Sequence, residues 1–266
     1  FEHTVTTVSP HAPNARGPAA YWRLSGPLPA SARTQVFTVK PVFAPGLDAN
    51  ARTAFSRRYT LRSDQPWLRP QQEQFYLRGE QSADVRVGLD RTLLSKPGLY
   101  VGTVAAVGHD DVDLRFQATV IVPHRFDAKN ERRLRLQGTA KGWIPDRIFV
   151  AVPPGASAMH LTLRAPDGSQ STARAPELFS PDGSVLTDWT FRLDTEGGRR
   201  VARWTVSDAL RPGVWEVCIS SVRPGDDSPW DLGVRFSGVA ADPQTLDEWE
   251  GEPNETVSLT LTNRFD

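Results

Sequence analysis

The fold class of the chain is decided by one stretch, Pro145-Asp-Arg-Ile-Phe-Val-Ala-Val-Pro-Pro-Gly-Ala-Ser-Ala-Met-His-Leu-Thr-Leu163. An apolar segment is followed by a Pro-Pro-Gly turn and by a second segment in which Met159, Leu161 and Leu163 alternate with polar residues. Proline presets φ and glycine supplies positive φ, so Pro153-Pro-Gly155 is typical of a turn between strands. The stretch therefore predicts a strand, a turn and a second strand.

The same period of two recurs along the chain. Apolar residues alternate with polar ones in four further runs, and short turns containing Pro and Gly separate such runs. The runs are Ala83, Val85, Val87, Leu89; Leu114, Phe116, Ala118, Val120, Val122; Trp215, Val217, Ile219; and Leu232, Val234, Phe236, with turns at Lys96-Pro-Gly98, Pro166-Asp-Gly168, Pro181-Asp-Gly183, Arg211-Pro-Gly213 and Arg223-Pro-Gly225. No segment shows a sustained helical stripe. The pattern predicts an all-β protein built from two antiparallel β-sandwich domains.

Three ranges of the chain are expected to differ in structure. Residues 1–125 would hold a Pro-rich segment and a first sandwich, residues 126–241 a second sandwich, and residues 242–266 an extra strand or the start of a third domain. In the first range, Pro97-Gly-Leu-Tyr100 resembles a hairpin of immunoglobulin- or fibronectin-like modules, in which the tyrosine is a packing residue. In the second, Pro212-Gly-Val-Trp215 resembles the closing strands of a galactose-binding-like jelly roll.

Composition and charge narrow the classes of partner. The formal net charge of the 266 residues is zero, so no overall field attracts nucleic acid, and we expect no nucleic-acid partner. No apolar run approaches the roughly 20 residues that a membrane-spanning helix needs, so no membrane span is expected. The chain opens at Phe1 without a Met or an apolar signal region, which favours a piece of a longer polypeptide.

Two segments carry a resemblance to a known family. Val152-Pro-Pro-Gly-Ala156 precedes an apolar strand, and Phe236-Ser-Gly238 ends a later one. These segments resemble the region that follows the catalytic domain in subtilisin-like serine peptidases of the tripeptidyl peptidase II kind. The resemblance implies a non-catalytic accessory region, with the catalytic domain of the same polypeptide as its partner. It would pack on that domain, restrict substrate access or build a homo-oligomer. The basic residues are almost all arginine, which favours a bacterial source, and an extracellular or periplasmic location is expected.

The motifs of a subtilisin-like triad are not present in this sequence. Such a site would need Asp-Ser/Thr-Gly, His-Gly-Thr and Gly-Thr-Ser, whereas Asp194-Thr195 leads to Glu196 and His109 leads to Asp110. We therefore assign no catalytic residue here and expect the triad of the parent peptidase upstream of Phe1. The alternative from another class is a carbohydrate-binding or adhesive β-sandwich module of a secreted protein.

The single cysteine and the histidines do not form a recognisable metal or catalytic motif. One cysteine excludes an internal disulfide and a multi-cysteine zinc site. Cys218 lies in an alternating run, which favours a buried strand residue over a reactive thiol. His160 alternates with Met159 and Leu161, so it is expected to face away from the apolar side of its strand.

A calcium site is a candidate in the run from Gly225 to Asp231. This run is expected to form a loop, and Asp226, Asp227 and Asp231 would supply hard oxygen ligands if the loop curls around an ion. The competing interpretation is an ordinary solvated turn. No other cofactor is indicated.

Eight tryptophans raise the carbohydrate-binding alternative. Trp143, Trp189 and Trp230 are placed at strand ends or in loops, where an indole ring can stack on a sugar. Trp204 and Trp215 lie in strand patterns and are expected in the core. A buried tryptophan is the commoner outcome in globular proteins. Quenching of tryptophan fluorescence by sugars would separate the two functional hypotheses.

Overall fold

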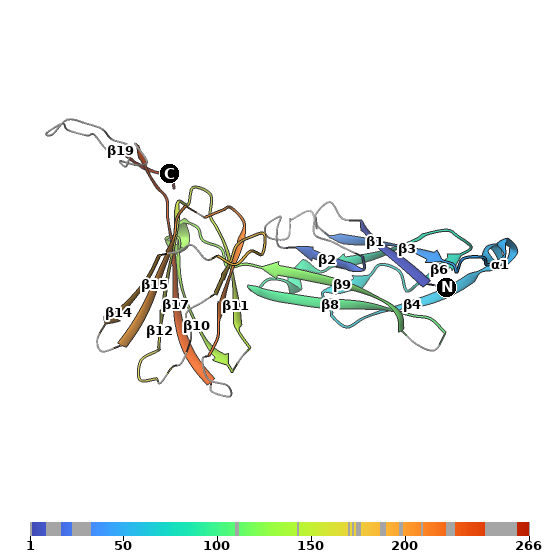
Figure 1. Ribbon diagram of the computed structural model, residues 1–266, viewed down its shortest axis with the longest axis horizontal. Coiled ribbons are helices and arrows are strands. Elements are labelled where there is room, and N and C mark those ends of the chain that lie inside the picture. Colours follow the sequence, from blue (N-terminus) through green and yellow to red (C-terminus); the bar gives the residue numbers. More distant parts are fainter. Residues whose placement is uncertain are drawn as a thin grey trace. The chain divides into compact units, whose positions relative to one another are not determined.

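The prediction of an all-β protein is confirmed by the computed structural model in Figure 1. The structure describes residues 2–8, 17–22, 33–109, 112–142, 144–169, 171, 173, 177–186, 190–196, 199–208, 210–221, 227–242 and 260–265. Contacts divide the chain into two compact units, Phe1–Pro123 and His124–Asp266. The identities predicted for the individual domains remain predictions.

The first unit is a sandwich of two sheets. One sheet has the order β1 (Glu2–Val8), β3 (Thr34–Val42), β7 (Ala83–Leu89), β5 (Leu68–Pro70); the other has the order β2 (Ala19–Trp22), β9 (Val112–Val122), β8 (Gly98–Val107), β4 (Ser56–Ser63), β6 (Gln74–Arg78). The strand pairs are antiparallel except β2 with β9, which run parallel with Ala19 opposite Gln117. Some neighbouring strands come from distant parts of the sequence, such as β3 with β7 and β2 with β9, whereas β8 and β9 are consecutive.

Aromatic side chains fill the core of the first unit. Phe37 and Phe116 approach to 5.1 Å between ring centroids, and Tyr59 stacks on Phe75 at 4.9 Å. The packing role expected of Tyr100 is confirmed, because its ring meets Trp67 edge-on at 6.3 Å. Its hydroxyl also donates to the Lys96 carbonyl at 2.9 Å. A tyrosine bonded back to the chain a few residues upstream is a feature of immunoglobulin-like sandwiches.

The second unit is also a two-layer sandwich. Its larger sheet has the order β10 (Arg133–Lys141), β17 (Asp227–Ser237), β12 (Ala158–Arg164), β15 (Arg199–Val206), β14 (Thr190–Glu196); its smaller sheet has the order β11 (Asp146–Ala151), β16 (Val214–Ile219), β13 (Glu177–Phe179). All these pairs are antiparallel. Among the described residues, five strands of one sheet face three of the other, and the jelly-roll identity stays a prediction. Trp204 and Trp215 are buried in the core, as predicted.

The strand–turn–strand prediction for residues 145–163 is confirmed as β11 and β12. The two strands belong to different sheets, so the turn at Pro153 and Gly155 carries the chain across the sandwich. Gly155 has a φ of +81°, which a glycine adopts without the steric cost that a Cβ would bring.

A short ribbon at the end of the chain pairs β18 (Val239–Asp242) with β19 (Thr260–Asn263). Beyond β19, the Arg264 amide donates to the Gly238 carbonyl at 2.5 Å. Arg132 donates to the Phe265 carbonyl at 2.9 Å, and its guanidinium lies 4.1 Å from the centroid of the Phe265 ring. Phe265 thereby packs against the core of the second unit.

Helical structure in the described part is limited to α1 (Ala49–Ala54) and two 3-10 turns, η1 (Arg91–Leu93) and η2 (Ala128–Asn130). The Asp48 side chain caps α1 by accepting from the Ala51 amide at 3.1 Å. Of the helices described, none has the length and apolar character that crossing a membrane requires.

Candidate functional site

The five-stranded sheet of the second unit has a buried face and an open face. On β12 the side chains at 159, 161 and 163 are buried, whereas His160, Thr162 and Arg164 are partly exposed. Successive side chains of a strand point to opposite faces. His160, Thr162 and Arg164 therefore stand on the open face, away from the core, as expected for His160.

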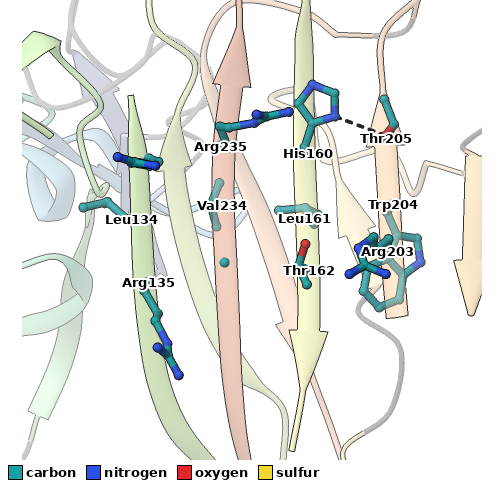
Figure 2. A pocket seen from close by; sticks show the side chains of 12 residues that line it. Leu134, Arg135, His160, Leu161, Thr162, Arg203, Trp204, Thr205, Val234 and Arg235 are labelled. Carbon is teal, nitrogen blue, oxygen red and sulfur yellow. Dashed lines mark hydrogen bonds between the residues drawn. The ribbon is translucent and has the colours of Figure 1, made fainter. Parts of the chain in front are cut away.

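The strand register extends this open face into rows of residues that lie directly opposite one another. Each row takes one residue from β10, β17, β12 and β15 in turn. The first row is Arg133, Arg235, His160 and Thr205, and the second is Arg135, Gly233, Thr162 and Arg203. Four distant segments of the sequence thus place four arginines and one histidine on a single surface (Figure 2).

A hollow of 520 Å³ opens at the middle of these rows. Gly233 lies at the centre of the hollow and has no side chain to fill it. A Cβ added to Gly233 would lie 3.7 Å from the Cβ of Thr162, which is an ordinary contact distance, so the hollow exists because this residue is a glycine. Arginines and His160 surround the space, while the backbone of β17 and β12 forms its floor. We call this feature the arginine hollow.

His160 is held in place by hydroxyl groups on both sides of its ring. Its Nδ1 lies 3.2 Å from Thr205 Oγ1, and its Nε2 lies 2.9 Å from Ser237 Oγ. Burial, reinforced by the positive charge of Arg235, lowers the pKa of His160 below 6.5, so the imidazole is neutral at pH 7. A Ser-His-Asp site instead places a carboxylate on the second ring nitrogen. In His160 the two ring nitrogens contact hydroxyl groups, and these contacts fix the orientation of the imidazole at the edge of the hollow.

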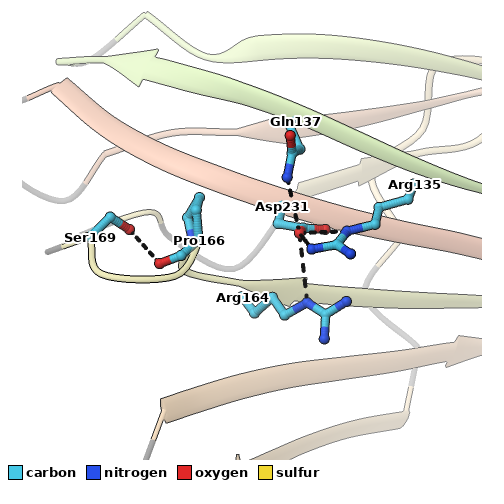
Figure 3. Close-up of polar contacts among 6 residues, drawn as sticks. All are labelled: Arg135, Gln137, Arg164, Pro166, Ser169 and Asp231. Atoms are coloured by element: carbon cyan, nitrogen blue, oxygen red, sulfur yellow. Dashed lines mark hydrogen bonds and ion pairs between the residues drawn. The ribbon is translucent and has the colours of Figure 1, made fainter.

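One end of the hollow is neutralised by Asp231, whose side chain is 1% exposed. Figure 3 shows Asp231 between two arginines. Arg135 donates to its Oδ2 through Nε at 2.6 Å and also through Nη2, and Gln137 Nε2 lies 3.4 Å away. Arg164 Nε is 3.8 Å from the same oxygen. Burial opposes ionisation, but the hydrogen bonds and positive charges outweigh it and lower the pKa of Asp231.

Two other arginines of this surface pair with exposed carboxylates. Arg133 pairs with Glu131, and Arg203 pairs with Glu196. Arg235 is exposed, and no ion pair of its guanidinium occurs within the residues that the structure describes. The arginine hollow therefore offers guanidinium and hydroxyl donors to an anion.

The loop expected at residues 225–231 is a strand from Asp227 onward, while the calcium assignment itself stays a prediction. Residues from Asp227 onward form strand β17, and Asp226 lies outside the described residues. An extended chain places Asp227 and Asp231 about 13 Å apart, too far to share an ion. Asp231 is instead occupied by Arg135. Within the described ranges, no three acidic, histidine or cysteine side chains form a group suited to a metal. Calcium binding stays a prediction that nothing tests.

Of the three tryptophans predicted to bind sugar, Trp230 requires a correction. It is 4% exposed, packs in the core, and donates from Nε1 to Asp146 at 2.7 Å. Its position in β17, not in a loop, explains this, because even-numbered residues of that strand face the core. Trp143 and Trp189 lie outside the described residues, so their assignment stays a prediction.

Cys218 is a buried strand cysteine, as predicted. Burial, together with the negative charge of Glu216 and a hydrogen bond to it, raises the pKa of this thiol to about 12. Glu216 is itself buried and pairs with Arg147. A thiol in this setting is protonated and inert at neutral pH.

Sequence reasoning missed the arginine hollow. Arg133, Arg135, Arg203 and Arg235 lie on three separate strands, and only the register between those strands places them together. A signal was present, since each of these arginines occupies a polar position of an alternating run. Alternation fixes the face of a residue but not its neighbours.

Comparisons with known proteins give a likeness of fold. No protein-family model and no curated protein sequence matches the chain. The crystal structure of tripeptidyl peptidase 2 (TPP II) superposes with a TM-score of 0.66 at 16% sequence identity, over 96% of this chain and 21% of that chain. A protein of unknown function from Porphyromonas gingivalis W83 is 12% identical over 77% of this chain and 76% of its own, with a TM-score of 0.27.

The likeness to TPP II is the informative one, because a TM-score of 0.27 carries no argument. The chain spans about a fifth of the length of the TPP II chain, so the match concerns one region of that peptidase. It shows that this chain has the fold of a TPP II region. The resemblance seen in the sequence is thereby supported at the level of the fold.

Proposed function

We propose that this chain is a non-catalytic accessory region of a subtilisin-like serine peptidase of the tripeptidyl peptidase II kind. One observation carries the proposal: a single superposition on TPP II includes 96% of the chain and so takes in both sandwiches. A generic β-sandwich would match one unit alone. The sequence adds that none of the three triad motifs occurs in this chain.

An accessory region of this kind acts through surfaces instead of through bond chemistry. The two units each have a separate aromatic and aliphatic core. Such rigid sandwiches suit packing on a catalytic domain, narrowing the path of a substrate, or joining copies of the enzyme. The carbohydrate-binding alternative is weakened, since the ring of Trp230 is buried and cannot stack on a sugar.

The test compares two forms of the parent polypeptide, one that contains residues 1–266 and one from which they are deleted. Hydrolysis of fluorogenic peptides and molecular mass by light scattering are measured for both, and for the chain 1–266 alone. We expect the chain alone to hydrolyse nothing, and the deletion to change the mass of the enzyme or its preference for substrate length. Unchanged mass and unchanged kinetics after deletion would contradict an accessory role.

A further inference from the structure

The arginine hollow points to a partner that neither the fold nor the comparisons assign. We propose that it binds an acidic segment of a protein chain, whose Asp or Glu carboxylates are held by Arg235, Arg203 and Arg135. The proposal goes beyond the accessory role and does not depend on it. It rests on the positions and charges of the open-face residues of β10, β17, β12 and β15.

The charge of this surface favours an anion. Its arginines with described side chains are five: Arg133, Arg135, Arg164, Arg203 and Arg235. Among the side chains that the structure describes, the carboxylates that pair with them are Asp231, Glu131 and Glu196. Counted over these described side chains, five positive charges stand against three negative ones, an excess of two. Because the whole chain has zero net charge, this excess is a local property of one face.

The spread of the donors over three strands favours several separate carboxylates over one phosphate, although a guanidinium pairs with either group. A guanidinium is planar and can offer two parallel N–H groups to one carboxylate. Beside the hollow, Arg135 already pairs with a carboxylate, since its Nε and Nη2 both donate to Asp231 Oδ2. An excess of two charges fits two side-chain carboxylates, whereas nucleic acids and other polyanions are bound by longer basic tracks. Neutral His160 adds no charge to this total.

The shape of the hollow favours an extended peptide as the carrier of those carboxylates. Its 520 Å³ lie within the range of sites that hold small ligands or a few residues. Gly233 and Thr162 form the floor, where a peptide chain can approach the sheet closely. The arginines on the two sides of this floor belong to different strands, so the distance between strands sets the distance between them (Figure 2). Strands lie about 4.8 Å apart, so Arg135 and Arg203, three strands apart, would reach different side chains of the peptide.

Peptide binding to the complete chain 1–266 tests the proposal. The probe is a short blocked peptide of alternating Glu and Ala, and its control is the same peptide with Gln in place of Glu, both titrated by calorimetry at low and at high salt. We expect the Glu peptide to bind at low salt, its affinity to fall with salt, and the Gln peptide not to bind. Equal binding of both peptides, or of neither, would overturn the proposal.

Matched variants locate the site. Arg235→Gln removes one charge from the hollow and should weaken the Glu peptide roughly tenfold, because hydrogen bonds to charged groups are the strong ones. Arg86→Gln removes an exposed charge from β7 in the first unit and should bind as the parent does. A loss as large in Arg86→Gln as in Arg235→Gln would show unspecific attraction and would count against the site.

Gly233→Val fills the hollow and leaves every arginine in place. An added Cβ there meets Thr162 only at an ordinary contact distance of 3.7 Å, and β-branched residues suit strands, so the variant is expected to fold. It should abolish binding of the Glu peptide. Retained binding would place the peptide elsewhere, and full competition by an equal concentration of inorganic phosphate would reassign the hollow to small anions.

Discussion

Gly155 shows how much one residue of the Pro-Pro-Gly turn decides. Its φ of +81° is open to glycine, and the carbonyl oxygen of Arg264 occupies the place where a side chain at this position would start. Because residue 155 is a glycine, Arg264 can pack directly against the turn. The sequence signals the turn, but the close approach depends on a residue more than 100 positions away.

Gly155→Ala is expected to destabilise the second unit more than Gly168→Ala does. Both glycines have positive φ, +81° and +72°, so both variants incur a backbone cost of about 1–2 kcal/mol. At Gly168 nothing lies within 4 Å of the added Cβ, whereas at Gly155 the Arg264 carbonyl must move. Urea denaturation measures the two losses. Equal losses would mean that residues 264–265 do not pack on this turn.

The thiol of Cys218 is expected not to react with a thiol reagent in the native chain at pH 8. Its side chain is buried, and its pKa is raised to about 12, so the thiolate that would react is scarce. Release of the chromophore from an aromatic disulfide reagent measures the reaction. Complete reaction in urea is the control, and rapid reaction without urea would contradict the burial of this strand.

The lowered pKa of His160 predicts a loss of stability in mild acid. The unfolded state, with the ordinary value of 6.5, binds a proton that the folded state binds only at lower pH. The free energy of unfolding should therefore fall as the pH drops from 7 through 6.5 and below. His124, which burial also shifts downward, contributes in the same sense. His160→Gln should reduce the slope of stability against pH, and an unchanged slope would contradict the shift.

At the scale of elements, alternation was sufficient to predict strands and the face of each residue. The runs at 83–89, 159–163 and 215–219 lie in strands β7, β12 and β16, and their apolar members are buried except Ala83, which is partly buried. The register between strands could not be predicted, because it depends on how the strands pack together, and the alternation within one strand carries no information on its partner. For that reason the arginine hollow was missed and Trp230, at a core-facing position of β17, was mistaken for a loop residue.

The pairing of β10 with β17 brings Arg135 to the buried carboxylate of Asp231, and substitutions can test how much this ion pair stabilises the fold. Arg135→Gln leaves the Asp231 carboxylate buried without its main partner and should cost about 3 kcal/mol, whereas Asp231→Asn removes the charge and should cost about 1 kcal/mol. Arg133→Gln is the control on the same strand and face. The side chains of Arg133 and its partner Glu131 are 64% and 67% exposed, so the loss of stability should stay below about 1 kcal/mol. Equal losses for all three variants would contradict this account of Asp231.

At the scale of the whole molecule, the chain is two sandwiches, each with its own core. The first is built around Phe37, Tyr59 and Phe116, and the second around Met159, Trp204 and Trp215. The fold class could be predicted from sequence because both cores rest on alternating apolar runs. The likeness to a region of TPP II extends over both units, and from it comes the proposal of an accessory role.

The central claim is that this chain serves a subtilisin-like catalytic domain in the same polypeptide. The most direct measurement is the sequence of the coding region immediately upstream of Phe1. We expect a continuous open reading frame that encodes Asp-Ser/Thr-Gly, His-Gly-Thr and Gly-Thr-Ser motifs in that order. A start codon and a signal peptide directly before Phe1 would contradict the claim.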